Sequence, residues 1–245
     1  MTPLDLVLVG VSAFLTSTIA GLSGYGAGLL MPLVLAPVLG AQAVVPVLAV
    51  AALFNNASRL LAFRDQVDWR RAAALVAAAV PTCILGATFY TRLDARQASC
   101  VIGLVLLLLV PARRRLGKRL IGGSTAAGVA SGAVYGLLIG SAPGAGLVLI
   151  PILMGMGLAG RAVVATDSAV SLTVGLVKVS TFQAFGFLPA AWWAAAIVIG
   201  LCGVPGAFVA RWLGDRLHAR VLDGILDAGV VIGGGMLLLR GLGLA

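Results

Sequence analysis

Several polar residues lie inside otherwise apolar stretches of this sequence, where charged and hydrogen-bonding side chains are rare and usually functional. The stretch TDSAVSLTVGLVK contains Asp167, Ser168, Ser171 and Lys178. At helical spacing Ser168 and Ser171 share one face. Hydroxyl groups beside an ammonium can bind an oxyanion through charge-assisted hydrogen bonds. These residue types therefore predict a binding site for a small anion.

A second polar stretch, FNNASR, ends another apolar segment and contains Asn55, Asn56 and Arg59. Asn55 and Arg59 share a helical face, so an amide and a guanidinium can act on the same ligand. Arg59 and Lys178 both lie in the last turns of their predicted helices. Snorkelling of the cation to the membrane surface is therefore the alternative to substrate binding at both positions.

The role of Asp167 is open at the level of sequence. Its carboxylate can carry a coupling proton, pair with nearby Arg161, or hold an organic cation. The chain has no glutamate and a single histidine, His218. We therefore predict no catalytic residues, no metal site and no cofactor.

Two glycine-rich stretches offer backbone groups to the same ligand. Residues 21–32 read GLSGYGAGLLMP and residues 140–151 read GSAPGAGLVLIP. A helix that breaks at membrane depth exposes unpaired backbone groups, which are tolerated only beside a protein-enclosed cavity. A helix N-terminus at that place favours an anion. We predict backbone contact with the substrate at Gly26, Gly28, Gly144 and Gly146.

Other interpretations of these glycines fit less well. A phosphate-binding loop needs a Gly-Lys-Ser/Thr ending, which is absent. A potassium filter needs a Thr-Val lead into Gly-Tyr-Gly, and the second stretch has no Gly-Tyr-Gly at all. A spacing of four residues predicts a ridge for close helix packing at Gly128, Gly132, Gly136, Gly140 and Gly144.

The amino-acid composition indicates whether this chain folds in water or in a membrane. Of its 245 residues, 61% are hydrophobic and 10% are charged, whereas a soluble domain has about 25% charged residues. Long continuous apolar runs predict helices rather than barrel strands. We therefore predict an all-α polytopic membrane protein. Seven runs approach the length of a bilayer span: 4–22, 41–61, 72–90, 97–110, 163–182, 189–209 and 222–239.

The two glycine-rich stretches belong to two copies of one unit. Gly-Ala-Gly recurs at an offset of 118 residues, and Arg59 meets Lys178 at an offset of 119. Repetition at a fixed period indicates duplication. We predict a first membrane repeat at 1–112, a basic linker at 113–120 and a second repeat at 121–245. In each repeat a short apolar piece, 28–39 or 146–157, either re-enters the membrane or spans it.

Charge predicts how the repeats are oriented. With the tract RRRLGKR in the cytoplasm, 13 of the 17 basic residues fall on the cytoplasmic side, as the positive-inside rule requires. The segment 41–61 then runs inward and its partner 163–182 runs outward. The two repeats of about four spans are therefore predicted to be inverted, as in many secondary transporters.

The sequence resembles the TauE/SafE sulfite exporter family of membrane permeases. The resemblance rests on the paired stretches GLSGYGAGLLMPLVL and GSAPGAGLVLIPIL, each followed by an Ala/Val/Ser/Thr-rich segment. It departs from the family in having Gly-Ala-Gly where a triple glycine is usual. The resemblance implies about eight spans in the cytoplasmic membrane and transport of sulfite, organosulfonates or related anions.

These observations together predict a secondary permease or exporter that moves a small sulfur oxyanion by alternating access around a midplane site. An anion channel of the same architecture is one alternative. An organic-cation exporter that uses Asp167 is another. The predicted partners are the anion and the lipid bilayer, with a homodimer left open and no nucleic acid.

Overall fold

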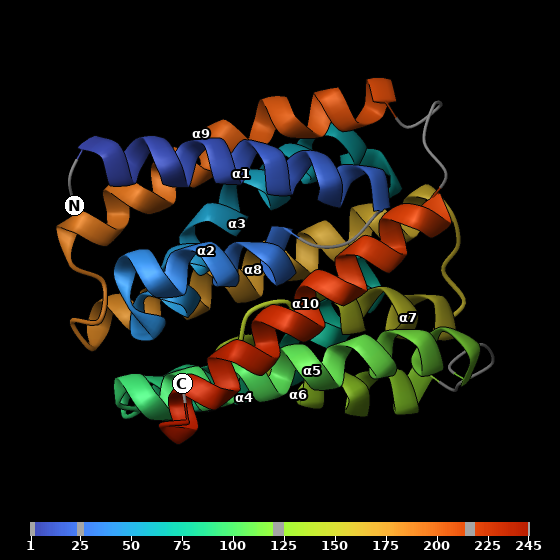
Figure 1. The fold of residues 1–245 in the computed structure, drawn as a ribbon. Coiled ribbons are helices and arrows are strands. Elements are labelled where there is room, and N and C mark those ends of the chain that lie inside the picture. The colour runs from blue at the N-terminus through green and yellow to red at the C-terminus, as the bar shows by residue number, and fades with distance from the viewer. Residues whose placement is uncertain (1–2, 24–26, 120–124, 214–218, 245) are drawn as a thin grey trace.

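The prediction of an all-helical chain is confirmed. The computed structural model describes residues 3–23, 27–119, 125–213 and 219–244, and every regular element within them is a helix (Figure 1). The elements are α1 Pro3–Ser23, α2 Ala27–Leu39, α3 Ala41–Phe63, η1 Arg64–Gln66, α4 Trp69–Thr91, α5 Ala95–Arg119, α6 Thr125–Ser141, η2 Ala145–Val148, α7 Leu149–Gly155, α8 Arg161–Ala184, α9 Ala190–Leu213 and α10 Ala219–Leu242.

Helices of membrane-spanning length and composition are present in the described part of the chain. Three helical segments there are long and apolar enough to cross a membrane: Ala41–Gln66, Trp69–Thr91 and Arg161–Ala184. Six further apolar helices contribute described apolar stretches of 10–17 residues. Large apolar side chains cover the outside of the bundle, and Leu61, Leu85 and Ile232 are well exposed. Such a surface suits lipid rather than water.

Each half of the chain opens with a helical hairpin. Thr16 of α1 contacts the sulfur of Met31 in α2 at 3.7 Å. In the second half, Gly128 near the start of α6 faces Met156, which follows α7. The chain therefore turns back on itself at both glycine-rich stretches, and α2 and α7 run back alongside the helices before them. α2, and η2 together with α7, agree with the short pieces predicted at 28–39 and 146–157 to within two residues at each end.

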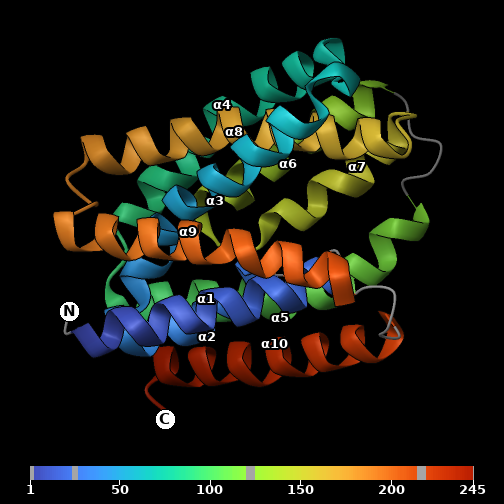
Figure 2. The same cartoon turned by 90° about the horizontal axis from the view of Figure 1, so that it is seen from above.

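Two long helices cross at the centre of the molecule. Figure 2 shows α3 and α8 between the α1–α9 pair and α4. Leu53 of α3 lies against Gly175 of α8, and Arg59 near the end of α3 meets Asp167 near the start of α8. The sequence positions rise along one helix as they fall along the other. The two helices are therefore antiparallel.

The outer helices pack through glycine. A side chain at Gly132 would meet Leu75, and one at Gly140 would meet the backbone of Cys83, so α6 lies parallel to α4. Between α9 and α1, a side chain at Gly206 would likewise meet the backbone of Phe14. The predicted packing ridge in α6 is confirmed, because these glycines let two backbones approach closely.

The basic tract within the predicted linker 113–120 is helical in its described part. α5 continues as a helix to Arg119. The run of helix-forming Arg, Lys and Leu residues explains the extension, since these residues lose little side-chain freedom in a helix.

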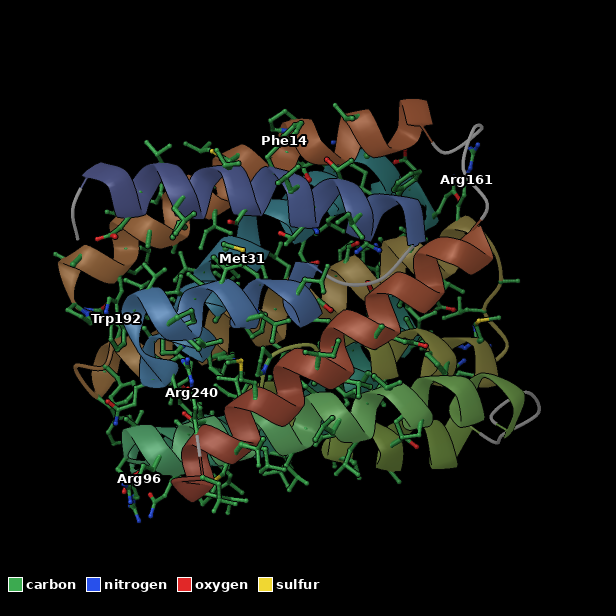
Figure 3. The ribbon with its side chains drawn as sticks, viewed as in Figure 1. Phe14, Met31, Arg96, Arg161, Trp192 and Arg240 are labelled. Carbon is green, nitrogen blue, oxygen red and sulfur yellow. The ribbon has the colours of Figure 1, made fainter. Side chains whose placement is uncertain are left out.

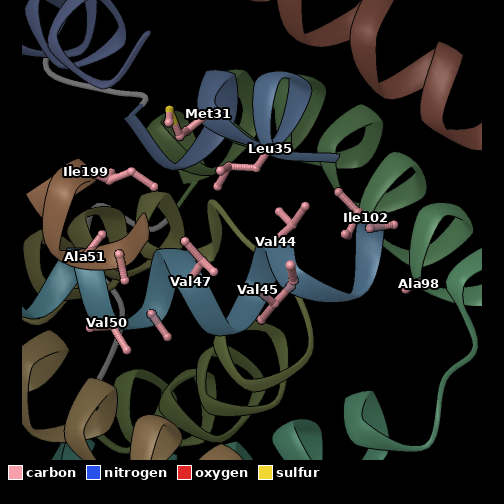
Figure 4. Packing of buried hydrophobic residues seen from close by; sticks show 14 of the residues in the cluster. Met31, Leu35, Val44, Val45, Val47, Val50, Ala51, Ala98, Ile102 and Ile199 are labelled. Atoms are coloured by element: carbon pink, nitrogen blue, oxygen red, sulfur yellow. The ribbon is translucent and has the colours of Figure 1, made fainter. Parts of the chain in front are cut away.

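The main hydrophobic core surrounds α2 and α3. Figure 4 shows Met31 and Leu35 of α2 above Val44 and Val47 of α3, with Ile102 of α5 beside them. All five side chains are buried. This packing fixes the start of α2, and therefore the first glycine break, against the middle of α3.

Candidate functional site

A cavity of about 230 Å³ lies at the crossing of α3 and α8, between the tips of the two hairpins. Most of the residues singled out in the sequence line it, although they come from four helices, α2, α3, η2 and α8, and from the connection before η2. The predicted residues on its wall are Gly28, Asn55, Asn56, Arg59, Gly144, Gly146, Asp167, Ser171 and Lys178.

The two glycine breaks meet at this cavity. A side-chain carbon at Gly28 would lie 3.3 Å from the backbone nitrogen of Gly144. Gly144 has φ of 79°, a left-handed conformation that glycine adopts without strain. A side-chain carbon at Gly146 would meet nothing within 4 Å. The Gly28 and Gly144 positions are thus closely packed, whereas Gly146 faces open space.

Arg59 and Asp167 form an ion pair across the two central helices. The Nη2 atom of Arg59 lies 3.3 Å from Oδ2 of Asp167. The carboxylate is buried, while the guanidinium side chain is 33% exposed. Pairing of Asp167 with Arg161, one of the sequence alternatives, is wrong. Figure 3 shows Arg161 at the edge of the molecule, and its residue is exposed.

Lys178 is held inside the protein. Only 4% of this residue is exposed, and its ammonium donates a hydrogen bond to the backbone carbonyl of Ile139 in α6. The ammonium also lies 5.8 Å from the ring centre of Phe182. The snorkelling alternative is therefore wrong for Lys178, because the side chain turns into the bundle.

Tyr135 is a lining residue that the sequence reasoning missed. Its hydroxyl lies 3.2 Å from the hydroxyl of Ser171, and both residues face the cavity. Tyr135 is fully buried in α6. The available signal was a single hydroxyl-bearing aromatic residue within a helix otherwise made of small and aliphatic residues.

One described residue of the predicted site stands apart from the cavity. Ser168 does not line it, because its hydroxyl donates to the carbonyl of Val164 one turn earlier in α8. A serine in the middle of a helix commonly uses this acceptor. Gly26 lies outside the described residues.

The two ends of the cavity differ in exposure. Lys178 is covered by Phe182, and the Phe182 ring packs edge-on against Tyr90 with 6.0 Å between ring centres. Phe182 and Tyr90 are both fully buried. At the other end, Asn55 is exposed and Arg59 is half-buried. The cavity is therefore closed at the Lys178 end and accessible at the Arg59 end.

The turn at the accessible end is fixed by Asp68. Its carboxylate accepts a hydrogen bond of 2.9 Å from the backbone N–H of Arg71 and so caps α4. Its own N–H donates to the hydroxyl of Thr166 in α8. The bond from the Arg71 N–H, supported by the Arg71 guanidinium, holds the pKa of Asp68 below its usual value. This turn joins α4 to α8 beside the ion pair.

Among the described residues of the cavity wall, one cation has no charged partner. Arg59 is neutralised by Asp167, whereas the partner of Lys178 is an uncharged carbonyl. Hydroxyl groups from Tyr135 and Ser171 stand nearby. In the part of the chain that the structure describes, no group of three or more His, Cys, Asp or Glu residues could hold a metal ion. The wall is suited to holding an anion.

Comparison with known families decides the class of protein. Residues 9–237 match the family model of the sulfite exporter TauE/SafE. The chain belongs to this family. Searches of curated proteins and of solved structures each found no significant match. As a member of the sulfite exporter TauE/SafE family, the chain is a multi-pass membrane permease of the sulfur-anion exporter class.

Proposed function

We propose that this chain is a secondary permease that moves a small sulfur oxyanion, sulfite or an organosulfonate, by alternating access. The observation that carries the proposal is the single cavity in which both glycine breaks and both repeat-matched cations meet. Substrate sites of many secondary transporters lie at the midplane between two repeats and are lined by interrupted helices.

The proposal includes two inverted repeats, 1–112 and 121–245, joined by the basic segment 113–120. It is supported by the direction of α3 and α8, which hold matching places in the element order and run antiparallel. It is also supported by the outer helices. α1 is parallel to α9, as α6 is parallel to α4, so each half packs its first α-helix on the fourth α-helix of the other.

In this account the anion binds between Lys178 and the glycine breaks. Lys178 supplies the charge, and the hydroxyl of Ser171 and the amides of Asn55 and Asn56 supply neutral donors. The open space at Gly146 lets an oxygen approach the backbone. Since one positive charge on the described wall is uncompensated, a singly charged anion fits the site best.

Asp167 is proposed to carry the coupling proton. An anion that reaches Arg59 competes with the Asp167 carboxylate for the guanidinium. A carboxylate that loses this partner in a buried place binds a proton more readily. The same ion pair weighs against an organic-cation exporter, because the negative charge of Asp167 is already compensated.

Alternating access is favoured over a channel because one end of the cavity is covered. A channel needs a continuous path, whereas here Phe182 and Tyr90 lie between Lys178 and the far end of α8. The accessible end carries the exposed residues Arg64 and Arg70. By the positive-inside rule we place this end in the cytoplasm and the protein in the inner membrane.

Flux measurements on the purified protein in liposomes test the proposal. Sulfite, sulfoacetate and chloride would be compared with and without an imposed pH gradient, and protein-free liposomes would serve as the control. The expected result is saturable flux of one sulfur oxyanion that depends on the gradient. Fast, unsaturated flux of several anions would indicate a channel. Absence of all anion flux from folded protein would contradict the proposal.

A further inference from the structure

The carbonyl group that holds Lys178 lacks its ordinary helical partner. In an α-helix the carbonyl of residue 139 accepts from the N–H of residue 143. Residue 143 is a proline, which has no N–H. The preceding bond of the series is intact, since the N–H of Ala142 donates to Leu138 at 2.9 Å. The helix bonding of α6 thus stops at the point where Pro143 stands.

Lys178 occupies the place of that missing donor. Its ammonium donates to the Ile139 carbonyl, and Ile139, Pro143 and Lys178 all line the cavity. A buried carbonyl without a donor is costly, and a buried ammonium without an acceptor is costlier still. One bond satisfies both groups. An ammonium has three N–H donors, so two remain for other acceptors.

We propose that Pro143 is a positioning residue for substrate binding. By removing a backbone donor it leaves the Ile139 carbonyl free, and that carbonyl holds the Lys178 ammonium at the cavity wall. The charge is then fixed in place without being neutralised. The inference rests on the proposed function, because it assigns to Lys178 the charge that binds the anion.

The first half of the chain holds its cation by other means. At the offset of 118 residues, the counterpart of Pro143 is Tyr25, which has a backbone N–H. Arg59, the counterpart of Lys178, is held by the Asp167 carboxylate instead. The proline anchor is therefore specific to the second half, and so is the uncompensated charge.

A double-mutant cycle between Pro143→Ala and Lys178→Met tests this proposal in liposomes with sulfite and sulfoacetate as probes. Pro143→Ala supplies an N–H that competes with Lys178 for the Ile139 carbonyl. We expect it to raise KM about tenfold, the size of a charge-assisted hydrogen bond, with less change in the maximal rate. In the Lys178→Met background the same substitution is expected to leave KM unchanged, because no ammonium remains to be displaced.

Thermal unfolding of the same four proteins gives a second reading that needs no transport. In wild type the new N–H competes for an acceptor already in use, whereas in Lys178→Met it pairs with a free carbonyl. Pro143→Ala is therefore expected to raise the melting temperature more in the Lys178→Met background. Pro143→Gly, which also supplies an N–H, replaces Pro143→Ala if that variant fails to fold.

The matched control is Pro81→Ala. Pro81 lies inside α4, whereas Pro143 follows the end of α6, and Pro81 is exposed and does not line the cavity. Its effect on KM and melting temperature is expected to be the same in both backgrounds. Additive effects of Pro143→Ala and Lys178→Met would overturn the positioning role. Absence of flux from wild type would instead overturn the proposed function, while the melting temperatures would still decide the role of Pro143.

Discussion

Arg59 in α3 and Lys178 in α8 occupy matching places in the two halves of the chain, yet the protein treats them differently. Arg59 is half-buried and paired with a carboxylate, whereas Lys178 is buried and held by a carbonyl. The comparison teaches that the two cations are held in different ways. Arg59 is paired with a titratable carboxylate at the accessible end, and Lys178 has an uncharged backbone carbonyl as its partner at the closed end.

The largest effect is expected from removing the uncompensated cation. Lys178→Met should lower the transport efficiency for a sulfur oxyanion about 100-fold, since loss of a buried charged partner costs several kcal/mol. Initial rates of uptake into liposomes measure this. Arg240→Met is the matched control, because Figure 3 shows Arg240 near the end of α10, and it does not line the cavity. Equal losses in the two variants would break the comparison between the cations.

A smaller effect on transport is expected at Arg59. Arg59→Gln should lower uptake about tenfold, because the guanidinium is partly exposed and already paired. It should also lower the melting temperature, since the buried Asp167 carboxylate loses its partner.

Adding Asp167→Asn sharpens this test. In the double variant Arg59→Gln/Asp167→Asn the melting temperature should recover, because no unpaired charge remains. The double variant should also transport the anion without dependence on a pH gradient, if Asp167 carries the coupling proton. Persistent dependence on the gradient would place the proton elsewhere.

Substitutions at the two glycines of the second break distinguish an effect on packing from an effect on substrate binding. Gly144→Ala should destabilise the fold by about 1–2 kcal/mol, because a left-handed residue with a side chain is strained and the methyl group would lie 2.6 Å from Leu29. Gly146→Ala has room and should leave the melting temperature unchanged. It should lower uptake a few-fold, because the methyl group enters the cavity. A stable Gly144→Ala variant would contradict the geometry of the break.

The smallest effect concerns the cap at the accessible end. Asp68→Ala should cost about 1 kcal/mol, the usual value of a helix cap, while Asp65→Ala, whose side chain is exposed, should cost little. The pKa of Asp68 is lowered in the folded protein. The stabilisation is therefore fully present above the ordinary aspartate pKa and is lost as the pH falls through the folded value. Melting temperatures of wild type and Asp68→Ala should converge at strongly acidic pH.

Much of the fold could be predicted because similar sequence patterns recur in the two halves of the chain. The offset of 118 to 120 residues aligns the glycine breaks, the cations and the short helices, and Gly28 and Gly144 do meet in space. Apolar composition was enough to predict helices. The length of each helix was harder to predict, because a continuous apolar run does not show where a helix with a basic end, such as α5, stops.

The residues that form the site could be predicted from the sequence better than the bonds between them. Residue types placed Asn55, Arg59, Asp167 and Lys178 at one site, and the cavity brings them together. The partners of the two cations could not be predicted, because they depend on how α3, α6 and α8 cross. Sequence distance favoured Arg161 for Asp167, whereas the antiparallel crossing delivers Arg59. The hydrogen bond from Lys178 to a backbone carbonyl cannot be predicted from the pattern of side chains, because every residue has a backbone carbonyl.

The most direct measurement of the central claim uses the open space at Gly146. Gly146→Cys would be introduced into a chain whose three native cysteines are replaced by alanine, and the rate of maleimide labelling would be followed as sulfoacetate is added. Asp65→Cys, on the exposed turn after α3, is the control. The account predicts that sulfoacetate slows labelling of Gly146→Cys alone, with half-protection near the KM for transport. Labelling of Gly146→Cys that is insensitive to every transported anion would contradict a substrate site in this cavity.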